Sequence, residues 1–120
     1  MSAIMNGLCL CGFRSYGSTF LSFSDYLKPA IRMACMMNLP VTYIFTHDSI
    51  SVGEDGPTHQ PVEQLLSLRT MPNLDVFRPA DTNEVIGTYK TILDKKEGPA
   101  AICLSRNTLP ILETAKANEV

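Results

Sequence analysis

The chain has 120 residues, of which 45% are hydrophobic and 18% are charged, and its formal net charge is -2. This length allows one ordinary domain with a hydrophobic core, and the composition is typical of a folded globular protein. The small negative charge and the lack of a basic stripe argue against nucleic acid as a partner, because phosphate binding depends on clustered Lys and Arg.

The N-terminal segment 1–13 is apolar but has no basic residue ahead of its apolar part, unlike a signal peptide. The longest later apolar stretch, 31–37, contains Arg32 and is far too short to cross a bilayer. We therefore expect a cytoplasmic protein with no membrane partner.

A helix is predicted over 2–10 from the spacing of Ile4, Leu8 and Cys11. It begins on the second residue with no cap and no preceding turn, so we expect a domain truncated at its N-terminus.

All four cysteines lie in apolar stretches, where a free thiol behaves as a small hydrophobic side chain. Their spacing matches no zinc pattern, so reduced core thiols are the main interpretation, with a metal or redox role as the alternative. They are Cys9, Cys11, Cys35 and Cys103.

The first strand is predicted at 16–21, after Gly12 ends the first helix. Ser22 or Ser24 can cap the next helix, which is predicted over 28–37 with Pro29 in its first turn. The apolar run after Pro40 predicts a buried strand over 41–46.

The polar stretch 46–61 follows this strand and contains both histidines of the chain, three carboxylates, two glycines and two prolines. It is too long for a simple connector, and long structured loops in compact domains are usually functional. The alternative is a polar turn with two solvent-exposed histidines.

Pro61 is predicted to open a helix whose apolar side contains Val62, Leu65, Leu66 and Leu68. A short strand over 74–77 follows. The next helix has a capping box at Asp81 and Glu84. Its apolar positions at helical spacing are Val85, Ile86, Tyr89, Ile92 and Leu93. A last strand is predicted over 100–104, and 113–120 is expected to be a frayed tail.

Alternating strands and helices predict an α/β fold with a three-layer parallel sheet and helices on both faces. Phe20 lies at the end of a predicted strand, and His47, the segment 79–81 and Arg106 each follow one, so they are expected to share one edge of the sheet. Open α/β sheets bind ligands at that edge, and an arginine there suits a charged ligand. The alternative for Arg106 is a structural pair with a carboxylate.

The long loop resembles the signature of transketolases, the thiamine-diphosphate enzymes that transfer two-carbon ketol units. The similarity covers nearly the whole chain. It includes Ser2 to Gly7, Gly17 to Leu21, Phe23 to Tyr26, His47 to Ser49, Gly53 to Pro61, Arg78 to Asp81, Leu104 to Arg106, and Leu109 with Pro110. Asn107 and Thr108 depart from the usual Gln-Asn of this family.

The resemblance implies that 1–112 is part of the pyrimidine-binding domain of such an enzyme. Phe20, Phe23 and Tyr26 match the aromatic residues around the cofactor's aminopyrimidine ring, although Tyr26 alternatively suits a helix turn facing the core. The family's activating glutamate would come just before Met1. The cofactor's diphosphate, with Mg²⁺ or Ca²⁺, is bound in the family by another domain.

The family's substrates are sugar phosphates, and its active site forms between the subunits of a homodimer. By resemblance, His47 and His59 are catalytic and substrate-binding residues, since imidazole can give and take protons near neutral pH. Asp55 matches the contact to the substrate's C2 hydroxyl, and Arg106 matches the phosphate ligand.

No metal site is expected in the chain itself, because the acidic spacing of the loop does not follow a calcium loop. The resemblance to the family's diphosphate motif at 54–56 is weak, because Glu54 stands where that motif needs glycine. Two alternatives remain for the whole chain: a domain of 1-deoxy-D-xylulose-5-phosphate synthase, and a non-enzymatic flavodoxin-like binding module. As a transketolase domain, the chain alone is expected to be inactive.

Overall fold

The computed structural model describes residues 1–112. Its sheet has four strands in the order β1-β2-β4-β3, and all three neighbouring pairs are parallel. The strands are β1 (Tyr16–Phe20), β2 (Thr42–Thr46), β3 (Asp75–Phe77) and β4 (Ala100–Cys103). Each lies within one residue of the predicted range, so the expected parallel α/β sheet is confirmed.

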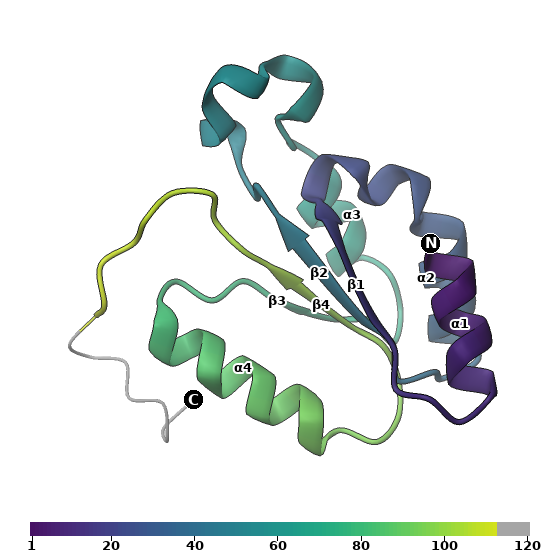
Figure 1. The fold of residues 1–120 in the computed structure, drawn as a ribbon. Coiled ribbons are helices and arrows are strands. Elements are labelled where there is room, and N and C mark those ends of the chain that lie inside the picture. Colours follow the sequence, from purple (N-terminus) through teal and green to yellow (C-terminus); the bar gives the residue numbers. More distant parts are fainter. Residues whose placement is uncertain (113–120) are drawn as a thin grey trace.

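Helices cover both faces of this sheet (Figure 1). Residues alternate between the faces along a strand, so Tyr43 and Phe45 of β2 point into one core while Ile44 contacts the other. The first core includes Met5, Ile31 and Leu68 and is covered by α1 (Ser2–Leu10), α2 (Lys28–Met36) and α3 (Gln64–Arg69). The smaller core contains Ile92 of α4 (Thr82–Asp94), which completes the three layers.

Arg14, between α1 and β1, connects two parts of the fold that are distant in sequence. Its guanidinium donates hydrogen bonds to the backbone carbonyls of Ile92, Leu93 and Lys95 at the end of α4. A helix leaves its last carbonyls without partners inside the helix, so a cation at this end stabilises it. Arg14 thereby fixes α4 against the start of β1.

The helix predicted over 2–10 is confirmed as α1, but the residues whose spacing predicted it do not face the core. Ile4 is 69% exposed, and Leu8 and Cys11 are exposed as well, whereas Ser2, Met5 and Asn6 form the buried side. Polar groups can occupy that side because they are hydrogen-bonded. Ser2 donates to the Tyr43 hydroxyl, which donates to Asn6, and burial raises the pKa of Tyr43 to about 12.

The prediction of four core thiols is only partly confirmed. Cys35 and Cys103 are buried and Cys9 is half-buried, but Cys11 is exposed just past the end of α1. All four thiols are free.

The helix after the long loop begins at Gln64 and not at Pro61. Its predicted apolar side is also partly wrong, because Val62 and Leu66 are exposed and only Leu68 is fully buried. The buried Gln64 side chain explains the late start, since its amide oxygen accepts a hydrogen bond from the backbone of Val62.

The cap predicted for α4 is present, whereas those predicted for α2 are not. Asp81 caps α4 by accepting from the backbone N–H of Glu84 at 2.9 Å, as predicted, but the Glu84 carboxylate bonds the N–H of Ala80 and not that of Asp81. On α4, Ile86 and Leu93 are exposed although they were predicted on its apolar side. The caps predicted for α2 were wrong, because no side chain caps this helix and Ser22 and Ser24 are buried without a hydrogen-bond partner.

None of the helices within residues 1–112 combines the length and apolar character needed to span a membrane. The tail predicted over 113–120 lies outside the described residues.

Candidate active site at the carboxyl end of the sheet

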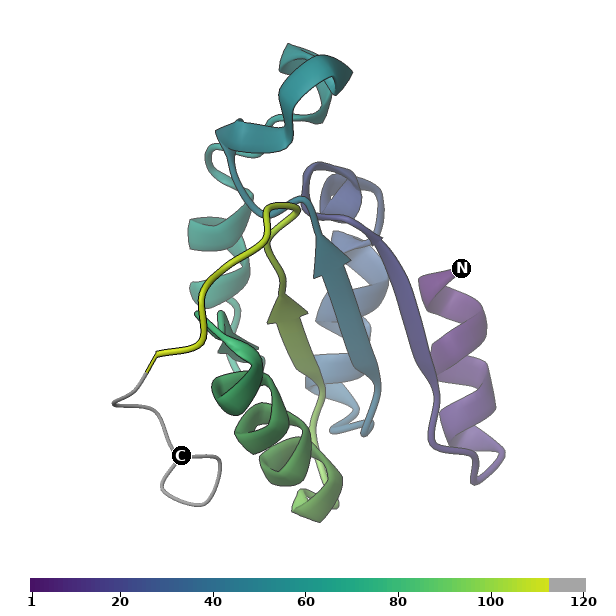
Figure 2. The ribbon, with the colours of Figure 1, turned by 60° about the vertical axis from the view of Figure 1, so that its left-hand side comes forward.

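The long loop between β2 and α3 extends beyond the carboxyl ends of the strands (Figure 2). It contains two short 3₁₀ helices, η2 (Ile50–Asp55) and η3 (Pro57–His59), where the sequence alone predicted only a loop. Gly56 separates them with a φ of 78° and a ψ of -173°, a conformation that is essentially restricted to glycine. This turn allows the chain to bring His59 back toward the end of β1.

Four rings from four segments form an aromatic cluster at this edge. Phe20 ends β1, and His47 stacks on its ring with the centroids 3.6 Å apart and the planes 19° apart. Phe23 of η1 (Leu21–Tyr26) stacks with Phe20 at 6.1 Å. His59 presents its ring edge-on to Phe20 and Phe23, with centroid distances of 5.9 and 5.1 Å. The structure therefore brings together both histidines and two of the three predicted cofactor residues.

The two imidazoles have separate polar neighbours. His47 Nδ1 shares a hydrogen bond with the Thr46 hydroxyl at 3.1 Å, and its Nε2 lies 4.0 Å from a carboxylate oxygen of Asp55. His59 Nδ1 shares a hydrogen bond with the Thr58 hydroxyl at 2.8 Å. The Nδ1 atom of each ring is therefore hydrogen-bonded to a threonine hydroxyl, and Nε2 of His47 faces Asp55, which is exposed.

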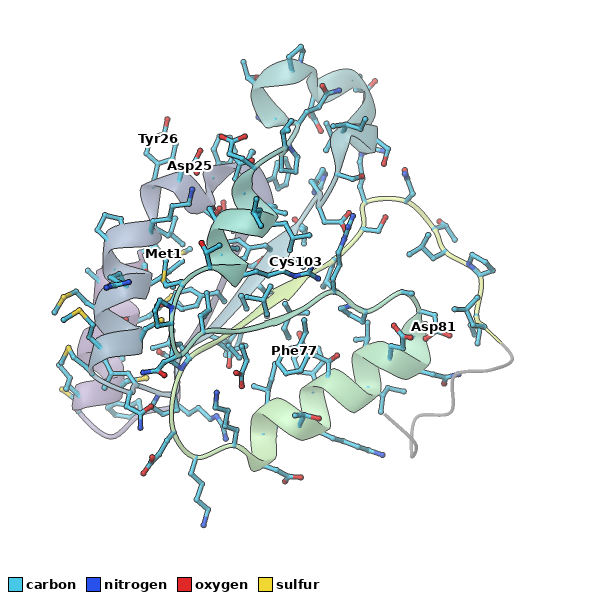
Figure 3. The ribbon with its side chains drawn as sticks, turned by 180° about the vertical axis from the view of Figure 1, so that it is seen from behind. Met1, Asp25, Tyr26, Phe77, Asp81 and Cys103 are labelled. Carbon is cyan, nitrogen blue, oxygen red and sulfur yellow. The ribbon has the colours of Figure 1, made fainter. Side chains whose placement is uncertain are left out.

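Tyr26 lies at the margin of the aromatic cluster. Its ring is 6.3 Å from that of Phe23 with the planes tilted by 41°, and the residue is 83% exposed. The side chain projects away from the body of the molecule (Figure 3), so the alternative of a core-facing tyrosine is wrong.

The segment η1 is held in place by the residue before Tyr26. Asp25 accepts from Lys28 and from the buried Gln64 of α3, and the hydrogen bond from Lys28 lowers the pKa of this carboxyl. The segment that carries Phe23 is therefore joined to both α2 and α3.

Arg106 follows β4 by three residues and is exposed. Within residues 1–112 no hydrogen bond or ion pair occupies its guanidinium, so the structural pairing considered from sequence is absent there. Its neighbour Asn107 donates to the Ser51 hydroxyl at 2.9 Å, which joins the Arg106 segment to the long loop. The structure shows no direct contact between Arg106 and the aromatic cluster.

Sequence reasoning missed an ion pair at this edge. Arg78 follows β3 directly, and its Nε donates to the Asp48 carboxylate at 2.7 Å. Asp48 is buried, and its charge adds to the effect of burial, which raises the pKa of the neighbouring Cys103 thiol to about 11. The rule that found Phe20 and His47 could have found this pair, because both residues also follow strands.

In the part of the chain that the structure describes, no group of three or more His, Cys, Asp or Glu side chains is arranged to hold a metal ion.

A parallel sheet whose strand ends carry stacked aromatic rings, two imidazoles and an exposed arginine defines an open α/β ligand-binding domain. The family model described as transketolase, pyrimidine binding domain, matches residues 1–111. The chain belongs to the transketolase pyrimidine-binding domain family.

Curated relatives agree with this assignment. A transketolase of Halalkalibacterium halodurans is 60% identical over 116 residues, which cover 96% of this chain and 17% of the relative. One of Physarum polycephalum is 54% identical over 119 residues, covering 98% and 18%. The chain thus spans less than a fifth of the length of these relatives.

Solved structures show the same fold. Transketolase of Pichia stipitis in complex with sedoheptulose-7-phosphate has a TM-score of 0.93 and 43% identity, and the match covers 98% of this chain and 18% of that one. A split gene transketolase, described as an inactive β4 tetramer, matches with a TM-score of 0.78 and 30% identity, covering 93% and 35%. The relatives named here favour neither the synthase nor the flavodoxin-like alternative.

Proposed function

We propose that this chain forms one wall of a transketolase active site, where a two-carbon ketol unit passes between sugar phosphates with the help of thiamine diphosphate. The observation that carries the proposal is the cluster of Phe20, His47 and His59 at the carboxyl end of the sheet, in a domain of this family. Residues 1–112 make up this domain in the proposal.

The aromatic part of the cluster fits the cofactor's pyrimidine ring. Phe20 and Phe23 are half-buried and stacked, and Tyr26 extends the aromatic surface outward. Offset stacking on such rings adds about 0.5–1.5 kcal/mol per pair beyond burial. When bound, thiamine diphosphate supplies the carbon nucleophile and the electron-accepting ring that cleavage next to a ketone requires.

The imidazoles and Asp55 face the position proposed for the sugar. Nε2 of His47 can donate to or accept from the substrate's carbonyl or hydroxyl oxygens, because its Nδ1 is already bonded to Thr46. We assign the same kind of proton transfer to His59, whose ring lies edge-on to Phe20. Asp55, exposed and 4.0 Å from His47, would accept a hydrogen bond from the C2 hydroxyl of the sugar.

Arg106 would bind the substrate's phosphate. Its guanidinium is exposed, and the described part of the chain offers it no competing carboxylate. A planar guanidinium matches phosphate oxygens with paired donors, which makes such contacts among the stronger hydrogen bonds.

The remaining parts of the proposal concern the intact protein. A Mg²⁺ or Ca²⁺ ion would hold the cofactor's diphosphate on another domain, and the active site would form in a cytoplasmic homodimer acting in the pentose phosphate pathway. The matching split gene chain is described as inactive and tetrameric. We expect this chain on its own likewise to be inactive and to self-associate.

The proposal is tested by His47→Ala in the intact enzyme. We expect kcat/KM for ketol transfer to fall by about 10²-fold or more, as for loss of a proton-transfer partner, while thiamine diphosphate affinity stays nearly constant. Glu54→Gln is the matched control, because Glu54 lies in the same loop and is exposed. A large loss of cofactor affinity in His47→Ala, or no loss of activity, would overturn the assignment.

A further inference from the structure

His47 has an unusual backbone conformation for a residue with a side chain. Its φ is 56°, in the left-handed region, where only two other non-glycine residues of the described chain are found, Asn38 and Asn73. Asparagine, aspartate and histidine occur in this region more often than other residues with a Cβ, but it is disfavoured for all of them relative to the right-handed region. Some part of the surrounding structure must therefore hold His47 in this conformation.

Asp48, the residue after His47, is held in place by an ion pair. The buried Asp48 carboxylate accepts a hydrogen bond from Arg78 Nε at 2.7 Å. Arg78 comes from the end of β3, which is separated from β2 by β4, so the ion pair crosses the end of the middle strand. Charge-assisted hydrogen bonds of this kind are short and strong, and breaking one leaves a buried charge without a partner.

A second contact fixes the loop on the same side. Ser51 bonds the Ser49 hydroxyl at 2.7 Å and accepts from Asn107 at 2.9 Å. Neither the ion pair nor the Ser51 contacts involve the imidazole of His47, which bonds the Thr46 hydroxyl and stacks on Phe20.

We propose that Arg78 is a positioning residue for His47: its ion pair with Asp48 holds the left-handed turn that presents the His47 imidazole on the ring of Phe20. Without Arg78, the Asp48 carboxylate moves toward water and carries the backbone of His47 with it. The catalytic consequence rests on the proposed function of His47, whereas the geometric consequence does not.

The geometry can be measured in the 120-residue chain by proton NMR, because it has only two histidines. The ring current of Phe20 should move the His47 ring protons upfield, given the stacking at 3.6 Å. We expect Arg78→Ala to abolish this shift and Arg78→Lys to restore part of it. Arg32→Ala, which removes an exposed arginine on α2, is the matched control and should leave the shift unchanged. Wild-type His47 signals in a folded Arg78→Ala chain would overturn the proposal.

The catalytic consequence is tested by a double-mutant cycle in the intact enzyme. Arg78→Ala should lower kcat/KM by about 10-fold to 100-fold, the effect expected when a reacting group is misplaced by about 1 Å. The same change in a His47→Ala background should have almost no effect, because the group that it positions is already gone. Equal losses in both backgrounds would show a merely structural role and overturn the proposal. If His47→Ala alone leaves activity intact, the proposed catalytic role of His47 is wrong. The chemical shift of the His47 ring protons in Arg78→Ala would still show whether Arg78 positions the imidazole.

Discussion

Arg106 and His47 lie at the same edge of the sheet in opposite physical situations. The His47 ring is stacked, half-buried and hydrogen-bonded, whereas the Arg106 guanidinium is exposed and free of partners within residues 1–112. A side chain that is already held in place suits directional proton transfer, because little ordering remains to be done when substrate binds. An exposed cation suits capture of a phosphate from solution.

Arg106→Ala in the intact enzyme should raise KM for phosphorylated sugars much more than for unphosphorylated ones, because only the former lose a charge-assisted contact. Steady-state kinetics with a matched pair of ketoses measures this difference, with Arg32→Ala as the control for loss of one positive charge. Equal changes in KM for the two sugars would remove Arg106 from the phosphate role.

Sequence reasoning succeeds at residue scale where a strand end identifies the position. It identified Phe20, His47 and Arg106 at one edge because parallel strands end together. The same rule places Asp48 and Arg78 at this edge, but it could not show that they pair, because the strand order that decides which of these side chains meet is not visible in the sequence. The left-handed φ of His47 carries no composition signal at all, since histidine is not a residue that requires it.

At the scale of elements, the strands were predicted well and the helix faces poorly. The two central strands, β2 and β4, are short and largely buried runs, and such runs are recognisable without knowing what covers them. The buried side of α1 instead contains Ser2 and Asn6, whose burial depends on distant partners such as Tyr43. Helical periodicity alone cannot distinguish an apolar side that faces this core from one that faces outward.

The cap of α4 predicts a pH dependence. The hydrogen bonds from the backbone of Glu84 and then of Leu112 hold the pKa of Asp81 below its ordinary value of 3.8. A carboxyl whose pKa is lower in the folded state than in the unfolded state stabilises the fold at pH values above its unfolded-state pKa. This stabilisation is lost as the pH falls through the folded-state pKa.

Asp81→Asn keeps an acceptor oxygen but cannot titrate, so its stability should fall less than that of the wild type when the pH drops below about 3.8. Denaturant unfolding at pH values above and below this point measures the difference. Other carboxyls with a lowered pKa, such as Asp25, are present in both proteins, so their effect on stability cancels in the comparison. The same dependence of stability on pH in both proteins would show that ionisation of Asp81 does not stabilise the fold.

At the scale of the whole molecule, the outer sides of α1 and α2 remain apolar. Ile4 and Leu8 on α1, Met33 and Met36 on α2, and Met37 directly after α2 are all exposed. Neighbouring apolar side chains in water favour association.

We therefore expect the chain to self-associate with rising concentration, and Met36→Glu to weaken that association. Sedimentation velocity over a range of concentrations measures it. Val62→Glu, at an exposed apolar position before α3, is the control and should leave association unchanged. A monomer at every concentration would contradict the prediction.

We propose that this domain supplies the aromatic platform and the substrate-binding groups, while most of the cofactor's affinity comes from contacts of its diphosphate and metal ion with another domain. Stacking on Phe20 and Phe23 adds only about 1 kcal/mol per pair, less than the several kcal/mol of freedom lost on association. Calorimetric titration of the chain with thiamine diphosphate and magnesium tests this most directly. We expect a dissociation constant no tighter than about millimolar, whereas one of about a micromolar would show that the binding determinants lie within these 120 residues.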